Sequence, residues 1–159
     1  MSDRAKNLAN RLNSFNEEVI SFVESCSQAD WEKICVEEWP VGVTARHIGA
    51  NHYTGAMALV ETILKGEKFP EITAEQVTET ANRHAREHAG CTKSDVLDVL
   101  RDAGRKIVSF TAGLKDFQLD KKFVLPMTGS EMSLEQFLET VILYSAGKHF
   151  KSVRAAAGK

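Results

Sequence analysis

The sequence predicts an all-α protein that folds as a four-helix bundle. Three observations support this class: apolar residues recur at three- and four-residue intervals, capping patterns precede several helical segments, and no convincing sheet pattern occurs. The 159 residues fit a single domain spanning 1–159. A chain of this length buries enough surface to fold without a disulfide or a structural metal.

The first helix is expected from Ser2 to about Ser25. Its apolar residues fall on one helical face: Leu8, Leu12, Phe15, Val19 and Phe22. A short helical segment between Ser27 and Cys35 follows, beginning with a capping pattern. Trp39-Pro40 then interrupts the chain, because proline disfavours a helical residue before it and lacks the donor that a helix interior needs.

The second long helix is expected from about Thr44 to Lys65, with Gly66 as its stop. Its apolar stripe comprises Ala45, Gly49, Tyr53, Ala56, Met57, Val60 and Leu64. The third helical region starts at a capping box of Thr73 and Gln76 and extends to about Ala112. A kink or a restart of the helix is expected around Gly90.

A long connection, residues 114–132, precedes the last helix. Pro126 and Gly129 mark a turn within it, where a short hairpin would fit. Ser133 and Gln136 form the capping box of the fourth long helix. The inward stripe of that helix is expected to contain Leu134, Phe137, Leu138, Val141, Ile142, Ser145, His149 and Val153.

The charge balance argues against nucleic acid as a partner. The chain carries 20 basic and 22 acidic residues, a formal net charge of −2, whereas phosphate-backbone binding needs a concentrated positive field. The only basic cluster lies near the C-terminus and suits a solvated helix end: Lys148, Lys151, Arg154 and Lys159.

The protein is expected to be cytoplasmic and not associated with a membrane. No window approaches about 18 consecutive apolar residues, and the N-terminus lacks an apolar signal core. The cysteines Cys26, Cys35 and Cys91 are an odd number at spacings that match no zinc knuckle or redox pair. Free thiols in a reducing compartment explain them most simply.

Two histidines are the candidates for a functional role. His149 falls on the apolar stripe of the last helix, where an imidazole needs a metal, a carboxylate or a water as partner. A histidine satisfied within the core is the alternative. His47 lies near the start of the second long helix and falls off the centre of its stripe, so spacing alone leaves it at the edge of the bundle.

Other titratable side chains are expected to lie outside a common site. His52 follows His47 by five positions, about 140° around an α-helix, so the two should not face one ion. His84 and His88 share a helix face among charged residues and are expected to be exposed. Tyr144 could approach the site, although packing in the core with a satisfied hydroxyl is the default.

Two segments resemble the DinB-like superfamily, which includes the N-terminal domain of maleylpyruvate isomerase. WPVGVTARHIGANHYTGAMALVETILKG is similar to the family's second helix, and SLEQFLETVILYSAGKHFKSVR is similar to its last helix, which normally carries two histidines four residues apart. The resemblance implies a single DinB-like four-helix bundle, a homodimer, and a zinc or nickel ion held by three histidines.

Carried onto this sequence, the resemblance makes His47 and His149 metal ligands. The first histidine of the last helix should fall at position 145, where this chain has Ser145. A serine hydroxyl is a poor ligand for zinc or nickel, so the three-histidine site is expected to be incomplete.

Two functions remain open at this point. The first is a divalent-metal-dependent enzyme acting on a small-molecule substrate, with thiol transfer as the reaction that the resemblance implies and hydrolysis as the runner-up. The second is a metal-free binding or structural protein with a decayed site, in which His149 hydrogen-bonds Ser145 or a buried water.

Overall fold

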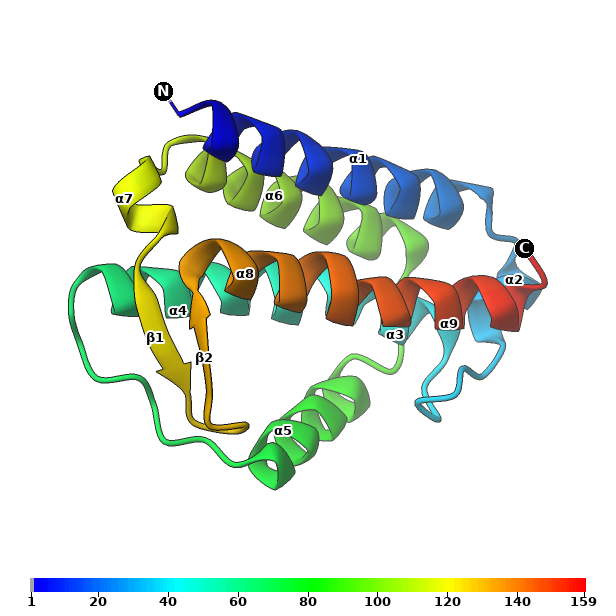
Figure 1. Ribbon diagram of the computed structural model, residues 1–159. Helices are drawn as coiled ribbons and strands as arrows, with labels where there is room; N and C mark the ends of the chain where they lie inside the picture. The colour runs from blue at the N-terminus through cyan, green and yellow to red at the C-terminus, as the bar shows by residue number, and fades with distance from the viewer. Residues whose placement is uncertain (1) are drawn as a thin grey trace.

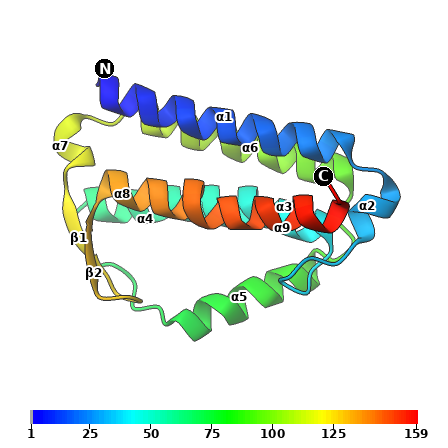
Figure 2. The same cartoon turned by 45° about the vertical axis from the view of Figure 1, so that its right-hand side comes forward.

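The computed structural model describes residues 2–159 and is helical apart from one short hairpin. Four long helical segments lie side by side (Figure 1; Figure 2). Two of these segments each consist of consecutive α- and π-helical elements that form one uninterrupted helix. The four segments are α1 (Asp3–Ser25); α3 (Val41–His47), η1 (Ile48–Tyr53) and α4 (Thr54–Leu64); α6 (Lys93–Ala112); and α8 (Leu134–Leu138), η2 (Glu139–Ala146) and α9 (Gly147–Ala157).

The remaining elements lie around the four long segments. They are α2 (Gln28–Glu32), α5 (Ala74–Glu87), α7 (Asp116–Leu119), β1 (Lys122–Leu125) and β2 (Ser130–Ser133). The two strands pair antiparallel with Lys122 opposite Ser133, and Gly129 adopts a φ of 67° in the turn between them. The short hairpin expected at this turn is therefore present. Helix α5 lies apart from the other helices and runs at an angle below them (Figure 1).

Hydroxyl side chains set the start of most helices. Thr73 and Ser133 form the expected capping boxes with Gln76 and Gln136, and Thr92 forms a further one with Asp95. That box begins a separate helix after Gly90, so the region 73–112 is two helices.

The second long segment starts earlier than expected, at Val41. Pro40, with its φ of −60°, is the residue immediately before the first turn of α3. The start of a helix tolerates proline, because the amide N–H that proline lacks would have no acceptor within the helix there.

Two parts of the long segments are π-helical, with hydrogen bonds from residue i to residue i+5. Segment η2 changes which residues of the last helix are buried. Beyond Ile142 the buried stripe runs through Ala146, Phe150 and Val153, whereas Ser145 and His149 are only half-buried. The wider helical turn shifts the inward face by about one residue relative to the α-helical expectation.

Helices α1 and α6 pack closely against each other in the core. The Asn16 side-chain amide donates a hydrogen bond to the carbonyl of Leu100 at 3.0 Å. A Cβ atom placed on Gly104 would lie 2.0 Å from that same Asn16 nitrogen. Glycine at position 104 therefore allows the two helices to approach this closely.

Within residues 2–159, no helix has the length and apolar character needed to cross a bilayer.

Candidate metal centre

Three histidines from two long helical segments meet in one cluster. His47 ends α3, His52 lies in η1, and His149 lies in the first turn of α9. One ring nitrogen from each histidine lies within 4.8 Å of the others. The ring centroids of His47 and His149 are 5.0 Å apart, and those of His52 and His149 are 5.1 Å apart. The two imidazoles singled out from the sequence thus face each other across neighbouring helices.

The expectation that His52 points away from His47 is wrong. In an α-helix, residues five apart are separated by about 140°. The chain between these two histidines is π-helical instead, and i to i+5 hydrogen bonding stacks residues five apart on one face. Segment η1 therefore brings the two rings together, with their centroids 5.0 Å apart.

Ser145 does not take part in the cluster. It lies half-buried in η2, and its hydroxyl makes no side-chain hydrogen bond within residues 2–159. His149 was expected to hydrogen-bond either Ser145 or a buried water in a metal-free site, and Ser145 is not its partner, because His149 Nδ1 contacts Glu37 instead. The third imidazole of the cluster comes from the second long segment, at His52, and not from position 145.

Hydrogen bonds fix the orientation of two of the rings. His52 Nδ1 lies 3.0 Å from the main-chain oxygen of Val141 in η2, and His149 Nδ1 lies 3.0 Å from Glu37 Oε1. Both partners are acceptors, so each Nδ1 carries the proton and donates. The lone pair of each ring is then on Nε2, which has no protein partner in the described chain.

Glu37 is held in place by a second contact and by the shape of its loop. The Ser152 hydroxyl donates to Glu37 Oε2 at 2.6 Å. The loop is closed by main-chain hydrogen bonds of 2.8 Å from Cys35 to Trp39 and from Val41 to Lys33. Next to Glu37, Glu38 adopts a φ of 66°. Sequence reasoning did not find Glu37, because a loop residue carries no periodic signal that relates it to a distant helix.

Burial keeps the histidines of the second segment neutral. The pKa of His47 is lowered to about 3, first by loss of hydration and then by the neighbouring His52, His149 and His84. The pKa of His52 is lowered to about 4, again first by burial and then by His149. Neutral imidazole is the form that binds a metal, so neither ring needs to lose a proton at neutral pH.

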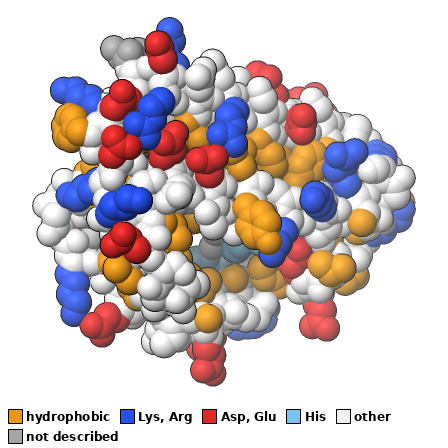
Figure 3. Space-filling model, viewed as in Figure 1, with side chains coloured by type: hydrophobic (Ala, Val, Ile, Leu, Met, Phe, Trp, Pro, Cys, Tyr) orange, Lys and Arg blue, Asp and Glu red, His pale blue; other side chains and the backbone are white. Residues whose placement is uncertain are grey.

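Helix α5 covers one side of the cluster. The Asn51 side-chain amide lies 3.0 Å from His84 Nδ1, and the Trp39 indole donates to Asn82 at 3.1 Å. His84 in α5 and His88, the C-cap residue of α5, are half-buried, so the expectation that both are exposed is wrong. On the face shown in Figure 3, histidine surface forms the floor of a hollow. Of the cluster, His47 lines a small cavity together with His84 and His88.

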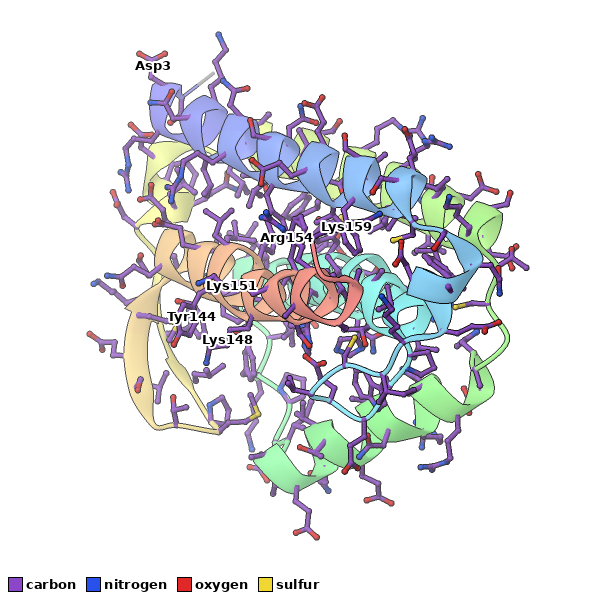
Figure 4. All side chains as sticks on the ribbon, turned by 90° about the vertical axis from the view of Figure 1, so that its right-hand side faces the viewer. Asp3, Tyr144, Lys148, Lys151, Arg154 and Lys159 are labelled. Carbon is purple, nitrogen blue, oxygen red and sulfur yellow. The ribbon has the colours of Figure 1, made fainter. Side chains whose placement is uncertain are left out.

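Tyr144 lies outside the cluster. It is 61% exposed, and the Lys148 ammonium lies 4.5 Å above its ring. Figure 4 shows it on the outer side of the last helical segment together with Lys148 and Lys151. The default expectation, packing in the core, is therefore wrong for this residue.

The cluster suits a zinc-class ion in its chemistry and its dimensions. Tetrahedral zinc with bonds of about 2.1 Å places its nitrogen ligands about 3.4 Å apart. Nitrogens within 4.8 Å of one another reach that spacing by small side-chain rotations.

Comparisons with protein-family models, curated proteins and solved structures found no match.

Three imidazoles and one open position are the ligand set of catalytic zinc sites, and structural sites are instead closed by a fourth protein ligand. Imidazole nitrogen also suits nickel and copper. The hydrogen bond between Glu37 and His149 is the outer contact that commonly orients a metal-binding histidine. The residues present thus fit a divalent transition metal.

Proposed function

We propose that this protein is a DinB-like four-helix bundle and a divalent-metal-dependent enzyme. His47, His52 and His149 are its metal ligands, with zinc or nickel as the ion. The proposal depends on the convergence of three ring nitrogens within 4.8 Å of one another. In two of these rings, His52 and His149, the Nδ1 atom hydrogen-bonds the Val141 carbonyl or Glu37, which leaves Nε2 free for a metal. A bound ion of this kind lowers the pKa of a coordinated water or thiol and so supplies a nucleophile at neutral pH.

The protein's own residues orient and protect the site. Glu37 and the Val141 carbonyl hold two rings with Nε2 turned away from their acceptors. Trp39 packs against His47 with ring centroids 5.1 Å apart, which limits water on that side. Thiol transfer is the reaction class that we favour, on the resemblance to DinB-like proteins, and hydrolysis is the runner-up.

A metal-free binding protein is the alternative, and the cluster argues against it. Ring nitrogens from three half-buried histidines lie within 4.8 Å of one another. The Nε2 atoms of His52 and His149 have no acceptor or donor of their own among residues 2–159. A divalent metal would give the three rings a common partner, whereas a metal-free binding protein has no evident need for three converging imidazoles.

Elemental analysis of protein prepared without a histidine tag tests the proposal. We expect about one zinc or nickel ion per chain in the wild type and a loss of at least about tenfold in affinity in His52→Ala and in His149→Ala. His88→Ala, at the C-cap of α5 and outside the cluster, is the control and should retain the metal. Absence of bound metal after incubation with excess zinc, nickel or manganese would overturn the proposal.

A further inference from the structure

A half-buried arginine that forms no ion pair and no side-chain hydrogen bond within residues 2–159 lies beside the histidine cluster, and its charge helps to lower the pKa of the nearby Asp95 carboxyl. Arg46 is the residue before His47 in α3. Its guanidinium forms no ion pair and no side-chain hydrogen bond with any residue from 2 to 159, although surface arginines such as Arg4, Arg11 and Arg101 each have a carboxylate partner. A guanidinium presents five donors, and leaving them unpaired in a partly dry place is unfavourable.

Arg46 lines a small cavity between α3 and α5, next to the histidine cluster. The polar part of the cavity wall consists of Arg46, His47, Asn51, His84 and His88. The cavity has room for about one water molecule. No carboxylate lines it, although the chain as a whole contains 22 acidic residues.

His84 adds a second donor to this cavity. The Asn51 amide nitrogen can only donate, so His84 Nδ1 accepts at 3.0 Å and the proton of the neutral ring lies on Nε2. Arg46 and His84 thus both contribute donor groups to the lining of this cavity. Such an arrangement is complementary to an anion and not to a cation.

A second, wider pocket shares Arg46 and His88 with the cavity. Three carboxylates, those of Glu87, Asp95 and Asp98, also line this outer pocket. Asp95 is committed to the amide of Thr92 at 3.1 Å, where it caps α6, and Glu87 lies 3.9 Å from Arg83. These acids repel a second negative group on any ligand that extends outward past Arg46.

We propose that Arg46 and His84 bind the carboxylate of a small monocarboxylate substrate whose reacting group lies at the histidine cluster. The planar guanidinium matches a carboxylate in a two-point contact. Because the inner cavity admits only about one water-sized group, one carboxylate oxygen enters it and the other lies toward the outer pocket, which Arg46 also lines. The carboxylates of that outer pocket disfavour a dianion such as phosphate. The role as substrate rests on the proposed function, whereas the carboxylate subsite does not require a metal.

Titration with simple probes, followed by NMR chemical shifts at constant ionic strength, tests this subsite. The probes are butyrate, its uncharged analogue butyramide, succinate and inorganic phosphate, each added to zinc-loaded and to chelator-treated protein. We expect butyrate to bind at least about tenfold more tightly than butyramide, and more tightly than succinate or phosphate. Arg46→Gln should weaken butyrate at least about tenfold.

Arg83→Gln is the matched control, because it removes the same charge from an exposed position on α5 and should change butyrate binding less than about twofold. If Arg46→Gln does not fold, Arg46→Lys is the variant to test. It should weaken butyrate binding, because an ammonium cannot make the two-point contact. Equal binding of butyrate and butyramide, tighter binding of phosphate, or unchanged binding in the folded Arg46 variant would overturn the inference.

Metal content measured on the same samples separates this inference from the proposed function. Butyrate binding that depends on Arg46 in a protein without metal would leave the subsite standing and defeat the metal-dependent activity. Stoichiometric metal without such butyrate binding would defeat the subsite alone.

Discussion

Glu37 reaches the histidine cluster from outside, through the Nδ1 atom of His149. Its other carboxylate oxygen accepts from Ser152, one turn further along α9. A carboxylate in this position fixes the ring and makes its second nitrogen more basic. Glu37 therefore orients His149 and would influence a metal only through that ring, which makes it a positioning residue.

Replacing Glu37 with glutamine should weaken metal binding by about 10- to 100-fold, because the amide keeps the shape of the side chain and removes its charge. Competition with a chromophoric chelator measures this change. Glu32→Gln, an exposed carboxylate just upstream that contacts Gln28, is the control. Equal affinities in the two variants would show that the Glu37 carboxylate does not support His149.

The two half-buried histidines of the second segment, His47 and His52, make stability depend on pH. In the folded protein without metal, the pKa of His47 is about 3 and that of His52 about 4, both below the ordinary value of 6.5. As the pH falls below 6.5, the unfolded chain takes up protons that the folded chain cannot, so the free energy of unfolding decreases. This loss continues until the pH reaches the folded-state pKa values.

Urea unfolding of chelator-treated protein between pH 7 and pH 4.5 should show this loss, at roughly 2 to 3 kcal/mol for each histidine. The double variant His47→Gln, His52→Gln should lose correspondingly less over the same range. A double variant with the same pH dependence as the wild type would mean that other groups control acid stability.

At the scale of single elements, segment η1 decides which residues form the site. Helix positions, capping boxes and the hairpin turn followed from apolar spacing and local side-chain chemistry, which the sequence carries directly. The π-helical turn did not, because a spacing of five between His47 and His52 predicts opposite faces in an α-helix. Only the observed hydrogen-bond pattern shows that they share one face.

Sequence spacing also could not predict which residues of the last helix are buried, or where the loop before α3 places its side chains. The stripe expected from α-helical spacing gave Ser145 and His149 as inward residues, and η2 buries Ala146 and Phe150 instead. The position of Glu37 depends on a backbone turn at Glu38 and on packing against α9, which no local pattern encodes. His149 was predictable as a candidate because an imidazole on an apolar stripe is itself an anomaly, whereas His47 was a candidate only through the resemblance to DinB-like proteins.

Deleting Ala50 should convert η1 into an ordinary α-helical turn in which the two histidines are four residues apart, again on one face. Metal stoichiometry should be retained, and the free energy of unfolding should change by less than about 2 kcal/mol. Elemental analysis and urea unfolding check both expectations.

Deletion of Ala58, in the regular helix α4, is the control for this experiment. It rotates the buried residues Val60 and Ile63 away from the core and should remove more than about 3 kcal/mol of stability. Loss of metal from the Ala50 deletion, with the fold intact, would show that the π-helical geometry itself is required.

At the scale of the whole molecule, close packing of α1 against α6 depends on Gly104. Gly104→Ala should decrease the free energy of unfolding by about 1 to 3 kcal/mol, because the new Cβ displaces Asn16 and breaks its bond to Leu100. Gly55→Ala in α4, where a Cβ meets nothing within 4 Å, should instead stabilise by about 0.5 to 1 kcal/mol. Thermal or urea unfolding of the two variants checks the opposite signs, and a neutral Gly104→Ala would contradict the packing argument.

Helix α5 differs from the other long helices in having no fully buried residue. Two of the side-chain contacts that hold it, Trp39 with Asn82 and Asn51 with His84, lie directly at the histidine cluster. Detaching α5 therefore exposes little apolar surface and costs little free energy. Its amide protons should exchange with solvent well before those of α1 and α6. Brief excursions of this one helix would widen the entrance to the cluster while the rest of the protein stays folded.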